Sequence, residues 1–83
     1  MDRGWNEFAE VCRRAFDSCT FKSALAKECG DNDDIAWATF YHAGEQSMQW
    51  LRHNVPALDG HVPSVLIATG QADRVRVCLM RMP

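Results

Sequence analysis

Histidine and cysteine are the residue types in this 83-residue chain that could do chemistry, with three histidines and four cysteines present. Zinc sites need Cys or His pairs at short spacings. His53 and His61 are eight residues apart, and no cysteine lies near either. A Cys–His nucleophile pair can be distant in sequence, yet nothing local favours one. No glycine-rich phosphate loop is present. We therefore expect no metal, no cofactor and no catalytic residue, and a protein that is not an enzyme.

The cysteines are Cys12, Cys19, Cys29 and Cys78, and no two of them form a C-x-x-C pair. An even count fits two disulfides, but only in a secreted chain. The first residues, Met1 to Gly4, lack the charged-then-apolar pattern of a signal peptide. The sequence therefore favours reduced thiols buried as small apolar groups, in a cytoplasmic protein.

The run Asp31-Asn32-Asp33-Asp34 is the acidic segment that a cation could use. A calcium loop also needs a glycine at its sixth position and a glutamate six residues beyond, which this segment lacks. The run instead predicts an N-cap and an acidic first turn for the helix that follows, where negative charge complements the helix dipole.

Apolar residues recur at spacings of three and four along most of the chain, and no strand-like alternation persists. This pattern predicts an all-α, small single-domain bundle of about five or six short helices. In the fourth helix, Met48, Trp50 and Leu51 are expected to face inward. Thr69 is expected to cap the sixth. The expected helices span 5–16, 21–29, 35–40, 45–53, 63–68 and 69–82.

The segment between residues 50 and 63 is predicted to form a turn that fixes the angle between two helices. A proline cannot continue a helix and pushes the residue before it to an extended shape. Leu58 is expected to pack under the turn, Gly60 to supply backbone freedom, and Pro63 to begin the next helix. The structural residues of this turn are Trp50, Leu51, Pro56, Leu58, Gly60 and Pro63.

The charge balance bears on the partner class. Nine Lys and Arg against eleven Asp and Glu give a net charge of −2, which makes DNA binding unfavourable. No run of ~18 apolar residues exists that could span a membrane. Arginine is enriched at protein interfaces, although the last helix's arginines also fit a solvated face. The candidate partner-binding residues are Arg52, His53, His61, Arg74, Arg76 and Arg81.

Residues 36–82 resemble the toxin-binding domain of Xre/MbcA/ParS-type antitoxins. In that family a glycine precedes W-L, a turn ending in A-L-G-G-[RK]-[ST]-P follows, and V-x-x-x-L-x-R-I closes the motif. Three positions within the turn depart from it: Asp59 stands at the first turn glycine, His61 at the basic position and Val62 at the hydroxyl position. The spacing from Thr69 to Val75 is also one residue shorter than in the family. The matching residues are Gly44, Trp50-Leu51-Arg52, Asn54, Pro56-Ala57-Leu58, Gly60, Pro63, Leu66-Ile67, Thr69, Val75, Leu79 and Arg81-Met82.

The resemblance implies one compact domain with two parts. Residues 1–35 would form a helical pair that packs on the rest or dimerises, and residues 36–83 the toxin-binding module. Such antitoxins bind RES-type toxins, which consume NAD, and block the active site. Here the tail Arg81-Met82-Pro83 would be placed to enter the toxin's cleft. The alternative is an inhibitor from a phage or mobile element, of the anti-CRISPR type, that binds a host defence complex with the same scaffold.

Overall fold

The computed structural model of the protein describes residues 3–82; Met1, Asp2 and Pro83 lie outside the described residues. Within this range the only β-structure is the isolated bridge between Val55 and His61. The expected all-helical fold is confirmed, with six α-helices and two short 3-10 helices. They are α1 (Arg3–Phe16), α2 (Lys22–Glu28), α3 (Asp33–Ala43), η1 (Gly44–Gln46), α4 (Ser47–Arg52), η2 (Pro56–Leu58), α5 (Pro63–Ala68) and α6 (Ala72–Arg81).

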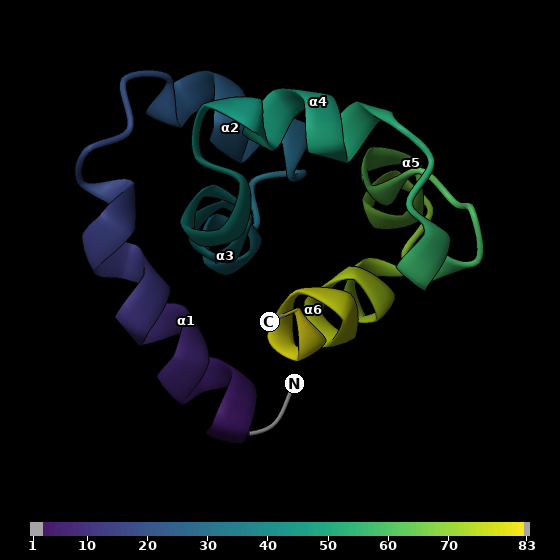
Figure 1. The fold of residues 1–83 in the computed structure, drawn as a ribbon, viewed down its shortest axis with the longest axis horizontal. Helices are drawn as coiled ribbons and strands as arrows, with labels where there is room; N and C mark the ends of the chain where they lie inside the picture. The colour runs from purple at the N-terminus through teal and green to yellow at the C-terminus, as the bar shows by residue number, and fades with distance from the viewer. Residues whose placement is uncertain (1–2, 83) are drawn as a thin grey trace.

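Helix α3 is the centre of the fold, and it is seen nearly end-on in Figure 1. It contacts α1, α2, α4 and α6. Its sequence is apolar around most of its circumference, which is the pattern of a helix buried on several sides. Ile35, Ala36, Ala38 and Thr39 are buried, while Trp37 and Phe40 are packed at the edge of the core.

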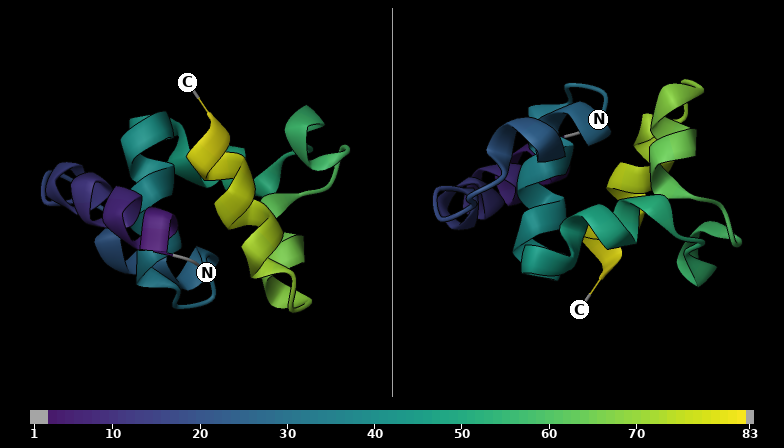
Figure 2. Two further views of the ribbon diagram at one scale, coloured as in Figure 1. Left: turned by 90° about the horizontal axis from the view of Figure 1, so that it is seen from below. Right: turned by 90° about the horizontal axis from the view of Figure 1, so that it is seen from above.

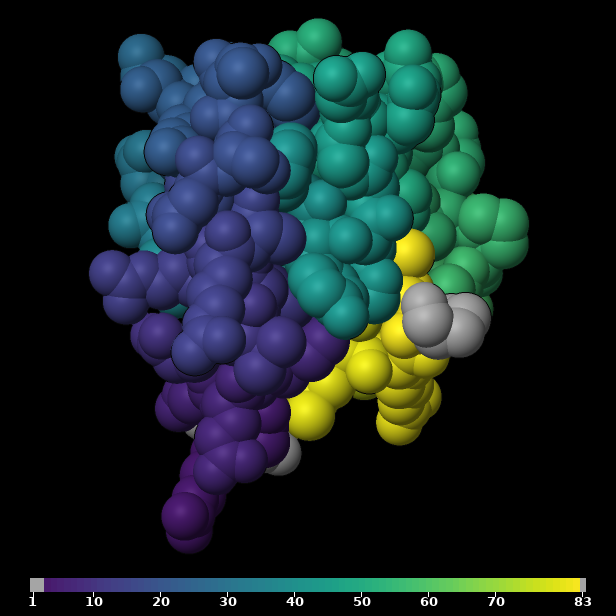
Figure 3. Space-filling view, turned by 60° about the vertical axis from the view of Figure 1, so that its left-hand side comes forward, coloured from purple at the N-terminus to yellow at the C-terminus, as the bar shows by residue number. Residues whose placement is uncertain are grey.

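Helix α1 is amphipathic, and its apolar stripe faces α3. Trp5, Ala9 and Cys12 recur at spacings of four and three and are all buried. On the outer side of this contact, the guanidinium of Arg13 lies 5.5 Å from the ring centre of Trp37, a cation–π geometry. In Figure 3, α1 lies against the helices from the middle of the sequence, drawn in teal, and α6, drawn in yellow, lies beside it.

The two parts predicted by the resemblance share this core. The boundary expected between residues 35 and 36 falls inside α3. Helix α1 packs against α3 and α6, and α2 packs against α3 and α4. Both views in Figure 2 place α1 at one side of the molecule and α5 at the other, with α3 and α6 between them. Dimerisation through the first 35 residues stays a prediction.

The acidic run before α3 forms a helix start, as predicted. Asn32 is the N-cap residue, but its side chain makes no capping bond; its Nδ2 donates to the carbonyl of Cys29 at 2.8 Å. Asp33 and Asp34 occupy the first turn. Gly30 precedes them at φ 62°, and a Cβ there would lie 2.9 Å from Ile67, so the close approach of α5 requires glycine.

Two expectations about the later helices are corrected. The helix predicted over 45–53 begins with a 3-10 turn, and α4 proper spans Ser47–Arg52. Thr69 does not cap α6, whose N-cap residue is Gln71. Gly70, at φ 83°, ends the preceding helix instead. The Thr69 hydroxyl therefore lies over the last turn of α5 and donates to the carbonyl of Val65 at 2.8 Å.

All four cysteines are buried free thiols, as predicted. Burial raises the pKa of Cys12 to about 11. Burial, reinforced by the charge of Glu28, raises the pKa of Cys29 to about 12. These thiols stay protonated near neutral pH and pack as small apolar groups. Among residues 3–82, no helix is both long and apolar enough to cross a membrane.

Candidate protein-binding site

The turn between α4 and α5 has the geometry that its sequence predicts. Val55 is extended before Pro56, which begins η2, and Pro63 begins α5. Leu58 is buried beneath the turn, and Gly60 adopts φ 79°. Leu51 is fully buried, whereas Trp50 is only partly buried and packs at the core's edge. The turn is thus a rigid element against which α6 can pack.

Hydrogen bonds close this turn on itself. The amides of Val55 and Gly60 donate to the carbonyls of His61 and Val55 at 3.1 and 3.0 Å. The Asn54 side chain donates to the Gly60 carbonyl at 2.6 Å. Asn54 matches the family motif, but sequence reasoning gave it no structural role, although asparagine at a turn commonly makes such side-chain bonds. Asp59, like Gly60, lies in the left-handed region, at φ 55°.

Helix α6 carries two stripes. Val75, Cys78 and Leu79 are buried against the core. A second stripe runs through Arg74, Val77 and Arg81, whose spacings of three, four and seven place them on one face. Val77 is 37% exposed, an apolar side chain outside the buried stripe. The sequence analysis missed Val77, although an apolar residue between two arginines on a polar face was a readable signal.

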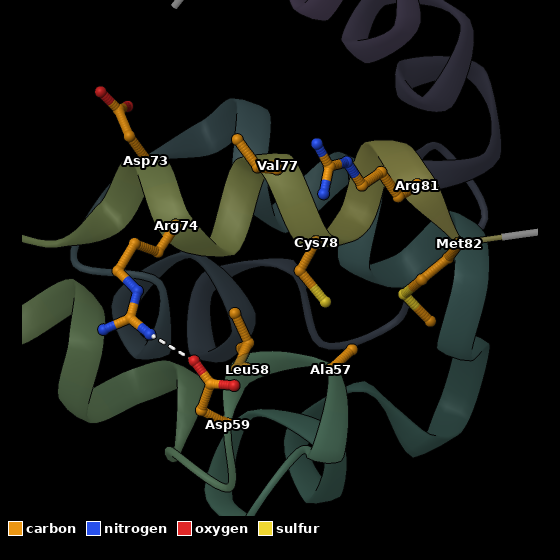
Figure 4. Close-up of a pocket in the computed structure, with 9 residues that line it drawn as sticks. All are labelled: Ala57, Leu58, Asp59, Asp73, Arg74, Val77, Cys78, Arg81 and Met82. Atoms are coloured by element: carbon orange, nitrogen blue, oxygen red, sulfur yellow. Dashed lines mark hydrogen bonds and ion pairs between the residues drawn. The ribbon is translucent and has the colours of Figure 1, made fainter.

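A groove of about 570 Å³ lies between η2 and α6, and we call it the α6 groove. Arg74, Cys78 and Met82 point from α6 toward η2, while Asp73, Val77 and Arg81 point to the other side of α6, away from η2 (Figure 4). Its volume is in the range of about 300–1,000 Å³ that is typical of ligand clefts. Its lining residues are Ala57, Leu58, Asp59, Asp73, Arg74, Val77, Cys78, Arg81 and Met82.

The two arginines of the α6 groove have different surroundings. Arg74 Nη2 lies 3.5 Å from Asp59 Oδ2, and the Asp59 side chain is 87% exposed. Such solvated pairs are weak because water screens both charges. Arg81 is exposed and has no hydrogen-bond or ion-pair partner among residues 3–82. The Cys78 thiol lies between them, and burial raises its pKa, so it adds no negative charge.

Arg76, predicted as an exposed contact, is instead held inside a polar cluster. The expected exposure was wrong because α6 turns this residue toward the start of α3, and a role in partner binding stays a prediction. Arg76 Nε donates to Asp34 Oδ2 at 2.9 Å, and Trp5 Nε1 donates to the same oxygen at 2.8 Å. Only 15% of the Arg76 side chain is exposed. We call Trp5, Asn32, Asp34, Asp73 and Arg76 the Asp34 cluster.

The charges of the Asp34 cluster are mutually stabilised. Burial opposes ionisation of Asp34, but hydrogen bonds from Arg76 and Trp5 and the charge of Arg76 outweigh it. The pKa of this carboxyl is therefore lower than usual. The hydrogen bond to Asp34 likewise raises the pKa of Arg76. The cluster joins α1, α3 and α6, and its role is structural.

The remaining predicted contacts lie outside the α6 groove. Arg52 forms a two-point ion pair with Glu28 of α2, at 3.0 and 3.2 Å. That pair raises the pKa of Arg52. His53 is exposed beyond the end of α4, where its Nδ1 lies 2.6 Å from the Gln49 carbonyl. His61 is exposed in the turn. Of the six predicted residues, therefore, Arg74 and Arg81 line the α6 groove and the other four do not.

Comparisons with protein-family models, with curated proteins and with solved structures found no match to this chain. Function must therefore be inferred from the molecule's own surface. Within residues 3–82 no three His, Cys, Asp or Glu side chains gather as a metal ion requires. The candidate site is therefore an apolar groove bordered by two arginines. Arg74 is weakly paired, and Arg81 has no partner among the described residues.

Proposed function

We propose that this protein is a protein-binding inhibitor that resembles the antitoxin of a type II toxin–antitoxin system. It would neutralise a RES-type, NAD-consuming toxin by covering the toxin's active site. The observation that carries the proposal is the α6 groove, in which residues 57–59 of the turn and the last helix combine into one open, partly apolar surface. These are the segments on which the antitoxin resemblance rests.

The backbone of the turn adds support at a position where the sequence departs from the family pattern. The family has two consecutive glycines there, and this chain has Asp59 and Gly60. Both adopt positive φ, 55° and 79°. Glycine adopts this conformation at no steric cost, and aspartate is among the residues that tolerate it best. The substitution is therefore compatible with the turn geometry that a glycine pair favours.

Inhibition by this surface needs no chemistry from the inhibitor. A stable protein–protein interface buries about 1,200–2,000 Å² in total, which suffices to close an enzyme cleft. The α6 groove supplies the apolar part of such an interface and Arg81 an unpaired charge. The tail beyond Arg81 includes Pro83, which lies outside the described residues, so its entry into a cleft stays a prediction.

The test starts from the tagged full chain, used to capture its partner from the native host with mass-spectrometric identification. The captured RES-domain protein is then purified, and its NAD consumption is titrated with the chain. We expect consumption to fall to background near a one-to-one ratio. Unchanged NAD consumption at saturating chain contradicts the proposal. Stoichiometric capture of a defence complex instead supports the anti-CRISPR-type alternative.

A further inference from the structure

The α6 groove is lined in part by apolar side chains. Leu58 and Cys78 in this lining are buried, and Val77 is 37% exposed to water. Apolar surface gains free energy when a partner removes it from water, in proportion to the area covered. The anchor that fits such a groove is an aliphatic or aromatic side chain.

The groove lining carries two carboxylates and two guanidiniums, so the formal charges balance, but they are not equally partnered. Asp73 already accepts from Arg76 Nη1 at 2.8 Å. Asp59 and Arg74 compensate each other across 3.5 Å. Arg81 remains without a partner among the described residues. A ligand group beside Arg81 therefore gains most if it is an anion, and a carboxylate is the anion that proteins carry.

We propose that the α6 groove binds a short segment of the partner protein that carries an apolar anchor next to an acidic residue, with the carboxylate at Arg81. The proposal rests on the proposed function only in taking a protein as the occupant. A second acidic residue of the segment displaces Asp59 from Arg74. Arg74 and Arg81 are seven residues apart, about 10 Å along a helix, which an extended segment spans in about three residues.

The first experiment selects short random peptides, displayed on phage, against the immobilised full chain. We expect the bound peptides to be enriched in Asp or Glu beside an aliphatic or aromatic residue. On the Arg81→Glu variant, the enrichment should change to Lys or Arg. The control is Arg14→Glu, because Arg14 is likewise exposed in the last turn of its helix. No enrichment, or enrichment that is the same on Arg81→Glu as on the wild type, overturns the proposal.

The second experiment measures affinity by fluorescence anisotropy with the best acidic peptide. Arg81→Glu should weaken binding at least about tenfold, equivalent to ~1.4 kcal/mol. Asp59→Asn should strengthen it, because it frees Arg74, and asparagine tolerates the left-handed backbone at this position. A gain of affinity cannot come from a damaged fold. Unchanged or weaker binding by Asp59→Asn overturns the displacement of Asp59.

A third variant tests the apolar anchor. Val77→Asp should abolish peptide binding, whereas Val65→Asp, at an exposed valine of α5, should not. Equal effects of the two variants overturn the assignment of the anchor. If decanoate binds the α6 groove and no peptide does, the proposal of a protein occupant is overturned and a lipid carboxylate is indicated instead.

The two proposals fail separately. If the chain neutralises a RES-domain protein and both Arg81→Glu and Val77→Asp do so equally well, the groove assignment is overturned and the function stands. If acidic peptides bind the wild type and lose affinity for both variants, while no RES-domain protein is inhibited, the antitoxin proposal falls and the groove assignment stands.

Discussion

The Asp34 cluster and the α6 groove lie on the same last helix and are built in opposite ways. In the cluster, Arg76 donates to three side chains, Asn32, Asp34 and Asp73, and is 15% exposed. In the groove, Arg74 holds one weak ion pair and an exposed hydrogen bond to Gln71, and Arg81 has neither among the described residues. Buried polar groups are costly unless they are satisfied, while exposed ones are not. The side chains of α6 in the Asp34 cluster thus stabilise the fold, whereas those in the α6 groove remain available to a partner.

The largest expected effect is at the aromatic member of the cluster. Trp5→Ala should lower the free energy of unfolding by about 3–5 kcal/mol, the usual cost of truncating a buried aromatic residue. Trp50→Ala should cost clearly less, because Trp50 is only partly buried. Urea unfolding followed by circular dichroism measures both. Equal losses would mean that Trp50 belongs to the core as fully as Trp5.

Arg74 and Arg76 lie two residues apart on α6, so the effects of replacing them can be compared directly. Arg76→Ala should cost about 1–3 kcal/mol of unfolding free energy, because it leaves a partly buried carboxylate with fewer donors. Arg74→Ala should cost less than about 1 kcal/mol, as for other exposed ion pairs. The same unfolding experiment compares them. A larger loss for Arg74 would contradict the division of α6 into a structural and an available side.

Acid should weaken the cluster in a defined window. The pKa of Asp34 is lower in the folded chain than the value of about 3.9 expected when unfolded. Its stabilising contribution is therefore complete above that unfolded value and is lost as the pH falls through the folded one. Between about pH 6 and about pH 3, wild type should lose more unfolding free energy than Asp34→Asn. Parallel losses in the two proteins would show that Asp34 is not stabilised.

The smallest expected effect on stability is in the groove. Val77→Asp should change the free energy of unfolding by less than about 0.5 kcal/mol, as is usual for exposed positions. The thermal midpoint and the helical signal in circular dichroism report it. A loss of several kcal/mol would place Val77 in the core and remove the contrast between the two regions.

Much of the fold could be predicted from local sequence signals. The spacing of Trp5, Ala9 and Cys12 predicts α1, and Pro56, Gly60 and Pro63 predict the turn. Positions within one helix follow from its periodicity, so these predictions need no knowledge of the rest of the chain. The error at Thr69 came from a hydroxyl that can serve either end of a helix.

The candidate site could be predicted only in part, because it depends on contacts between distant segments. Arg74, Arg76 and Arg81 are alike in the sequence, and their roles differ only through what packs beside them. Asp34, 42 residues before Arg76, decides that Arg76 turns inward. Arg74 stays at the surface, where it forms a weak pair with Asp59, 15 residues earlier. No periodicity encodes either pairing.

The position of Asp34 in the chain has a consequence for how the molecule is completed during synthesis. Its carboxylate accepts from Trp5, 29 residues earlier, and from Arg76, 42 residues later. A growing chain holds the first partner long before the second exists. Contacts between residues so far apart close large loops and form late. In the nascent protein, the Asp34 carboxylate therefore lacks its Arg76 donor until α6 has been synthesised and has packed against α3.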